Sequence, residues 1–137
     1  MKHSNAVANG PQRKTFAKGA TIFKEGDKAD AAYILESGSV EIFKMVGGRR
    51  IELGTVRSWG IFGELGLIDD RPRMAAAYAA QESVCMVVSK EAVAGLLDGA
   101  PEGLHVLIAS LVQIIRTAGE ELAEARFQLL EMRSQAS

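Results

Sequence analysis

The sequence predicts a mainly β fold: a β-roll or jelly roll of about eight short strands, followed by a short helix and a long helix. Two observations support this fold class. From residue 15 to residue 89, short apolar runs alternate with Gly, Asp and Ser, as expected for short strands joined by tight turns. After Ser89 these turn signals become sparse, and apolar residues recur at helical spacing instead.

The expected strands follow one another closely through the first two thirds of the chain. They are residues 21–23, 32–35, 39–44, 50–53, 75–80 and 83–88. Gly38 marks the turn between the second and third of these strands. Gly47 and Gly48 mark a hairpin tip, because paired glycines adopt positive φ angles at little cost.

The helical part begins at Ser89, a suitable N-cap for a short helix that ends near Gly99. Pro101 then fits the first turn of a long second helix. The chain therefore divides into a flexible tail (residues 1–14), the roll (15–100) and a long lid or dimerisation helix (101–133).

Composition narrows the classes of function. The 137 residues carry a net charge of -1 with the basic residues dispersed, so no basic surface for nucleic acid stands out. Neither a membrane span nor a signal peptide is recognisable. Cys85 is the single cysteine and lies in an apolar run, which predicts a buried, unreactive thiol. We therefore expect a cytoplasmic protein.

Polar chemistry is concentrated in residues 62–75, which we call the cassette. Glu64 can accept hydrogen bonds from hydroxyl groups, and Arg73 can donate two parallel hydrogen bonds to a phosphate. Gly63 and Gly66 allow the main chain to approach a ligand closely. A ligand with a sugar hydroxyl beside an anionic phosphate suits this set.

The sequence FGELGLIDDRPRMAA, which starts at Phe62, resembles the phosphate-binding cassette of cyclic-nucleotide-binding domains. That family includes the catabolite activator protein and the regulatory subunits of protein kinase A. Residues 18–27 resemble its first strands and turn, and residues 32–42 resemble its glycine-containing hairpin. The resemblance implies a regulatory domain, not an enzyme, that binds cAMP or cGMP without a metal or other cofactor and couples binding to its C-terminal helix.

The resemblance also implies roles for individual residues. Glu64 accepts a hydrogen bond from the ribose 2'-hydroxyl, and Arg73 faces the ligand and pairs with the cyclic phosphate. Apolar residues line the ribose and base, and polar residues of the long helix contact the adenine edge. The ligand-binding residues expected in this way are Phe62, Gly63, Glu64, Leu65, Arg73, Met74, Ala75, Ile42, Leu53, Gln113, Arg116 and Thr117.

Two positions depart from the family pattern. Met74 stands where the family often has Ala, Ser or Thr, and a threonine there helps many cGMP-selective domains to hold a syn guanine. Because Met74 cannot donate a hydrogen bond, the sequence favours cAMP over cGMP. Trp59-Gly60 is the second departure, since the family usually has its glycine one position earlier.

The long helix carries an apolar seam with alternating spacings of four and three residues. Its members are Leu104, Ile108, Leu111, Ile115, Ala118, Leu122, Ala125, Leu129 and Met132. Such a heptad pattern predicts a homodimer through paired helices. Leu107, Val112 and Ile114 form a second apolar face, which we expect to contact the roll. The alternative is a helix that packs only on its own domain.

Two other functions remain open at this stage. A ligand-free scaffold of the same fold is one, and Met74, which could crowd the pocket, is its best support. A cupin-type jelly-roll enzyme is the other, but residues 16–89 lack the histidines that its metal site needs. His3 and His105 have no partners at metal-ligand spacing, and no catalytic triad is recognisable.

Overall fold

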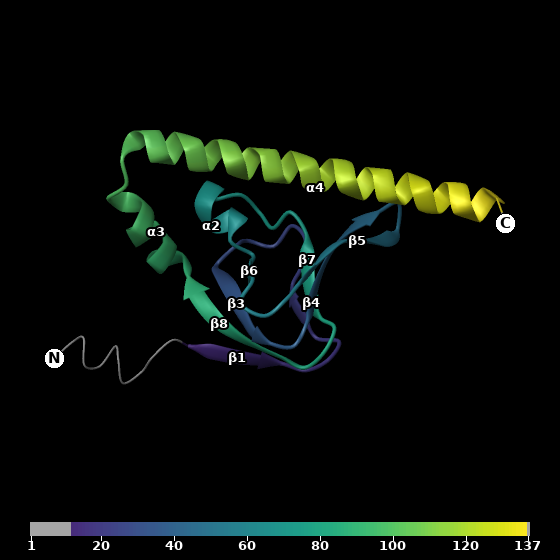
Figure 1. The fold of residues 1–137 in the computed structure, drawn as a ribbon, viewed down its shortest axis with the longest axis horizontal. Helices are drawn as coiled ribbons and strands as arrows, with labels where there is room; N and C mark the ends of the chain where they lie inside the picture. The colour runs from purple at the N-terminus through teal and green to yellow at the C-terminus, as the bar shows by residue number, and fades with distance from the viewer. Residues whose placement is uncertain (1–11, 137) are drawn as a thin grey trace.

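The computed structural model describes residues 12–136, which form a two-sheet β-roll with a long helix lying across it (Figure 1). Both sheets are antiparallel. One sheet has the order β1 (Arg13–Phe16), β8 (Ser83–Ser89), β3 (Ala31–Ser37), β6 (Ile61–Phe62). The other has the order β2 (Thr21–Phe23), β7 (Ala76–Ala79), β4 (Val40–Val46), β5 (Arg49–Val56). The predicted fold class is confirmed.

Three helices follow or interrupt the strands: α2 (Leu65–Asp69), α3 (Lys90–Asp98) and α4 (Glu102–Ala136). The Ser89 side chain accepts a hydrogen bond from the Ala92 backbone N–H, so the predicted N-cap of α3 is confirmed. None of the helices formed by residues 12–136 carries an apolar stretch of the length that a membrane span needs.

The roll begins earlier than expected. Arg13 and Lys14 fall inside the expected tail, yet they belong to β1 and pair with Met86 and Cys85 of β8. The Arg13 guanidinium also bonds the Glu36 carboxylate at 2.7 and 3.0 Å. Polar side chains on an exposed edge strand show no apolar alternation, which is why this strand was missed. The rest of the expected tail, residues 1–11, lies outside the described residues.

Apolar side chains from both sheets meet in one core. Tyr33, Leu35 and Cys85 come from the first sheet, and Val40 and Ala77 come from the second. Cys85 is fully buried, and this burial raises the pKa of its thiol to about 11. The expected burial of the Cys85 thiol is confirmed.

Two turns explain why particular glycines are needed. Gly38 has a φ of +104°, and a Cβ there would lie 2.4 Å from the Ser83 Oγ, so that no side chain fits. Gly47 and Gly48 have φ angles of +56° and +79° and form the predicted hairpin tip between β4 and β5. Trp59 has a φ of +71°, a conformation that favours glycine. The glycine that the family resemblance leads us to expect at this position would adopt this φ angle at lower cost.

Helix α4 packs on the roll through a face that shares only Val112 with the one expected. Val112, Arg116 and Ala123 are buried, so the expectation for Val112 is confirmed. Leu107 and Ile114 are 54% and 62% exposed, so the expectation that they contact the roll is wrong. At about 100° per residue they lie roughly 140° and 160° around the helix from Val112. The buried stripe therefore excludes them.

Candidate functional site

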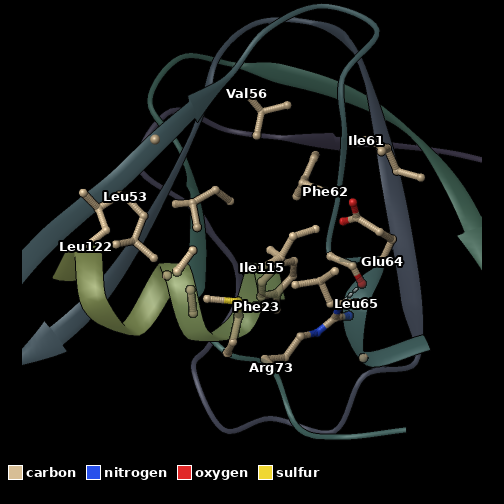
Figure 2. Close-up of a pocket in the computed structure, with 18 of the residues that line it drawn as sticks. Phe23, Leu53, Val56, Ile61, Phe62, Glu64, Leu65, Arg73, Ile115 and Leu122 are labelled. Carbon is tan, nitrogen blue, oxygen red and sulfur yellow. Dashed lines mark hydrogen bonds between the residues drawn. The ribbon is translucent and has the colours of Figure 1, made fainter. Parts of the chain in front are cut away.

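A cavity of about 460 Å³ lies between the roll, the cassette and α4 (Figure 2). Figure 2 shows Leu53 of β5 and Leu122 of α4 together on one side, with Phe62 and Glu64 on the other. The lining is mostly apolar, with Glu64 and Arg73 as its charged members. The lining residues are Phe23, Ile42, Leu53, Gly54, Thr55, Val56, Ile61, Phe62, Gly63, Glu64, Leu65, Gly66, Arg73, Met74, Ala75, Ile115, Ala118, Gly119 and Leu122.

Arg73 is the buried cation of the cavity, with 5% of the residue exposed. Its Nη1 donates to the Gly63 carbonyl and its Nη2 to the Ala31 carbonyl, both at 2.7 Å. Its guanidinium carbon lies 4.0 Å from the centre of the Phe23 ring. Within the described residues its Nε is buried without a hydrogen-bond partner. The side chain is thus held in place, while its buried Nε–H is satisfied by no group of the described residues.

The environment of Arg73 is poor in compensating negative charge. The Asp30 carboxylate lies 3.5 Å from Nη2, but the Asp30 side chain is 85% exposed, so solvent weakens their attraction. Burial lowers the pKa of Arg73, although the guanidinium stays protonated because an arginine pKa lies so high. A bound anion in the cavity would relieve this unfavourable burial of charge.

Glu64 supplies the carboxylate of the cavity. It occupies the N-cap position of α2 with a φ of -81°, and its side chain makes no capping hydrogen bond there. Burial raises the pKa of Glu64, and a hydrogen bond with its own backbone offsets this only in part. A half-buried carboxylate of this kind is suited to accept hydrogen bonds from a ligand hydroxyl.

Two cassette glycines are required by close packing. Gly63 has a φ of +79°, and a Cβ there would lie 2.8 Å from Nη1 of Arg73. A Cβ at Gly66 would lie 2.4 Å from the Ala29 Cβ and 2.7 Å from the Arg71 carbonyl oxygen. These contacts leave no room for side chains, so both glycines help to fold the cassette around Arg73.

Most of the residues expected to bind the ligand do line this cavity. Ile42 and Leu53 are 11 positions apart in the chain and come together here with the cassette residues. The cassette members among them are Phe62, Gly63, Glu64, Leu65, Arg73, Met74 and Ala75. Their roles toward a ligand remain predictions.

The expected contacts from α4 differ from the structure. Gln113 and Thr117 are exposed and hydrogen-bond each other at 3.3 Å, away from the cavity lining. Arg116 is buried against Asp69 instead. The helix presents a neighbouring face to the cavity. Sequence analysis assigned three of its four residues only to the dimer seam and gave Gly119 no role. That face consists of Ile115, Ala118, Gly119 and Leu122.

Met74 reaches across the cavity toward α4. A Cβ added at Gly119 would come 2.2 Å from the Met74 Cε, so the methionine fills the notch that this glycine leaves. The Met74 carbonyl accepts a hydrogen bond from the Lys44 ammonium at 2.6 Å. Met74 therefore occupies part of the space next to Arg73.

Metal chemistry gains no support from the described residues. In the segment 12–136, no group of three or more His, Cys, Asp or Glu side chains is placed to hold a metal ion. The polar side-chain groups of the cavity are the Glu64 carboxylate, the Arg73 guanidinium and the Thr55 hydroxyl, a set suited to an organic anion that carries hydroxyl groups.

Comparison with known proteins agrees with a site for an organic anion. The family model described as the cyclic nucleotide-binding domain matches residues 13–100. The cyclic AMP receptor protein of Thermus thermophilus is 31% identical over 118 residues, which are 85% of this chain and 55% of the receptor. The chain therefore spans about half the length of that relative.

Solved structures give the same result. The cAMP-bound form of the EAL enzyme Bd1971 superposes with a TM-score of 0.78 at 30% identity, over 91% of this chain and 33% of that chain. The cGMP-bound form of the same enzyme superposes with a TM-score of 0.74 at 30% identity, with the same coverage. The likeness thus extends to a protein solved with either nucleotide.

Proposed function

Because the chain belongs to the cyclic nucleotide-binding domain family, we propose that it is a sensor which binds cAMP in the cavity and signals through α4. The observation that carries this proposal is Arg73: a buried guanidinium with an unpaired Nε, in an apolar cavity that also holds Glu64. The sensor acts by binding alone, in the cytoplasm. The tail, the roll and the lid helix are its three parts.

The chemistry of a cyclic nucleotide matches the lining. Its single phosphate charge fits Arg73, and its ribose hydroxyl fits Glu64. The purine fits apolar side chains such as Leu53 and Ile115. A cavity of about 460 Å³ falls within the usual range of roughly 300–1,000 Å³ for small-molecule sites.

The proposal also includes selectivity for cAMP over cGMP. Met74 lines the cavity and has no donor for a guanine. Met74 also takes up space against Gly119, which is the strongest support for a scaffold that binds no nucleotide. Titration separates these two possibilities.

Coupling to α4 is supported by the residues that the helix contributes. Ile115 and Leu122 line the cavity and also belong to the apolar seam. A ligand that contacts them favours one position of α4 over others, and this differential contact is what transmits a signal.

The proposed partner is a second copy of the chain. Six seam residues of the 35-residue helix α4 remain 37–65% exposed. They are Leu104, Leu111, Ile115, Leu122, Leu129 and Met132. Pairing of two such helices would remove this apolar surface from water.

Calorimetric titration with cAMP and with cGMP tests the binding proposal. We expect saturable binding of cAMP that Arg73→Ala weakens by about tenfold or more, because a charge-assisted contact to the phosphate is lost. Arg71→Ala is the matched control, since Arg71 is exposed and lies outside the cavity lining. A folded wild type that binds neither nucleotide would support the ligand-free scaffold instead.

Sedimentation tests the dimer. Leu129→Glu places a charge in the seam outside the cavity, so the dimer should dissociate while cAMP still binds. Gln128→Glu, at an exposed position of the same turn, is the control. A wild type that sediments as a monomer at micromolar concentration would leave α4 as a lid on its own domain.

A further inference from the structure

Helix α4 contacts the cassette on both sides of Arg73. The Arg116 Nε and Nη2 donate to the two Asp69 carboxylate oxygens at 2.5 and 2.9 Å. The Arg116 Nη1 donates to the Pro72 carbonyl at 3.3 Å. We call these three residues the Arg116 network. On the other side of Arg73, Met74 fits against Gly119 of α4.

The Arg116 network is buried and specific. Arg116 is 6% exposed, and the Asp69 side chain is 18% exposed. Burial opposes ionisation of Asp69, but hydrogen bonds from Arg116 and from the Arg71 backbone N–H outweigh it and lower the Asp69 pKa. The carboxylate is therefore ionised at neutral pH. Separating Arg116 from Asp69 would leave a buried charge without its partner, which is strongly unfavourable.

The network acts on the part of the cassette that carries the phosphate-binding arginine. Asp69 is the last residue of α2, and Asp70 turns the chain with a φ of +56°. The Pro72 carbonyl belongs to the peptide unit that leads directly into Arg73. Arg116 thus restrains the chain at two points within four residues of Arg73.

We propose that Arg116 is a positioning residue: it holds Asp69 and Pro72 against α4, so that Arg73 is aligned for the phosphate only while α4 is docked. This inference rests on the proposed function and names how that site is regulated. Nucleotide binding and docking of α4 then favour each other through the cassette backbone, in addition to any contact between the purine and the helix.

A competing restraint makes this inference testable. The Arg73 backbone N–H donates to the Asp27 carbonyl at 2.8 Å, and the Gly26 N–H donates to the Arg73 carbonyl at 2.9 Å. If this turn alone fixes Arg73, then Arg116 is dispensable for its position. Both amides are also natural reporters, because their exchange with solvent measures how often the segment opens.

The first experiment is hydrogen exchange on the ligand-free full chain, with Arg116→Gln compared with wild type. We expect the Arg73 amide to exchange about tenfold faster or more in the variant, a larger change than at the core strands β3 and β8, which report any loss of global stability. Arg126→Gln is the matched control, because Arg126 lies on the same helix but bonds the Glu52 carbonyl of β5 at 2.8 Å. Unchanged Arg73 exchange in Arg116→Gln would overturn the inference.

The second experiment measures cAMP affinity in a double-mutant cycle. Arg116→Gln should weaken binding by about fivefold in the wild-type background and have little effect in an Arg73→Ala background, because its influence passes through Arg73. Arg116→Lys, which keeps the charge but not the two-pronged contact, should recover part of the affinity. Equal losses in both backgrounds would show a general structural role and contradict the inference.

The two experiments distinguish failure of the proposed function from failure of the Arg116 inference. If the wild type binds no nucleotide, the proposed function is wrong, but the exchange measurement still decides whether Arg116 holds the cassette. If Arg116→Gln does not fold, the comparison of Arg116→Lys with wild type gives the same two readouts. Faster Arg73 exchange in Arg116→Lys supports the network, and unchanged exchange contradicts it.

Discussion

Replacing Arg73 should weaken the fold as well as ligand binding. The sequence suggested a side chain that faces only the ligand, yet Arg73 also bonds the Gly63 and Ala31 carbonyls and stacks on Phe23. Arg73→Ala removes both donors and the ring contact together. The affinity lost in this variant therefore has to be separated from a loss of stability.

The size of the effect follows from opposing contributions. Each hydrogen bond from a charged donor contributes about 1.5–3 kcal/mol. Against this, the guanidinium is buried with only the exposed Asp30 carboxylate at 3.5 Å, so removing it relieves a desolvation cost. Water in the enlarged cavity can also reach the freed carbonyls. We expect Arg73→Ala to lower the free energy of unfolding by about 1–3 kcal/mol.

Urea denaturation followed by circular dichroism measures this change. Arg73→Lys keeps a cation that can reach one carbonyl, so its stability should fall between those of wild type and Arg73→Ala. Arg71→Ala should stay close to wild type because Arg71 is exposed. If the denaturation midpoints of Arg73→Ala and wild type coincide, the two carbonyl bonds contribute nothing to the fold and this reasoning fails.

Three further predictions concern the cavity and the β4–β5 pair. Met74→Thr should shift the affinity ratio toward cGMP in competition against a fluorescent analogue, because it adds a hydroxyl beside the purine. Glu64→Gln should raise the melting temperature at neutral pH while weakening cAMP binding. Burial raises the Glu64 pKa, so the protonated form contributes stability below about pH 4.3 that is lost as the pH rises. A hydrogen bond with Glu41 raises the pKa of Glu52 to about 6. The proton held between the two carboxyl groups therefore stabilises the fold fully below roughly pH 4.3, and this stabilisation is lost as the pH rises to about 6. Glu52→Gln should therefore melt at a higher temperature than wild type at pH values above 6 and near wild type in acid; equal melting at both would contradict this assignment.

Structural features that depend on residues close together in the sequence could be predicted. The glycine pair at the hairpin, the Ser89 cap and the short strands depend on local backbone preference, and the structure confirms them. The cassette could also be recognised, because Glu64 and Arg73 stand in a distinctive motif nine residues apart.

The features that sequence analysis did not predict depend on contacts between residues far apart in the chain. Arg116 meets Asp69 across 47 positions, and nothing near either residue indicates the other. The rotation of α4 about its axis is set by such contacts, which is why Gln113 and Thr117 were expected in the cavity in place of Ile115 and Leu122. Strand β1 was missed for a different reason, since its residues are mostly polar.

A crystal structure of the chain grown with saturating cAMP tests the central claim most directly. The account predicts one nucleotide in the cavity, with a phosphate oxygen within hydrogen-bonding distance of Arg73 and a ribose hydroxyl on Glu64. It also predicts α4 docked, with Arg116 still bonded to Asp69. An empty cavity under these conditions, or a nucleotide bound at another surface, would contradict the account.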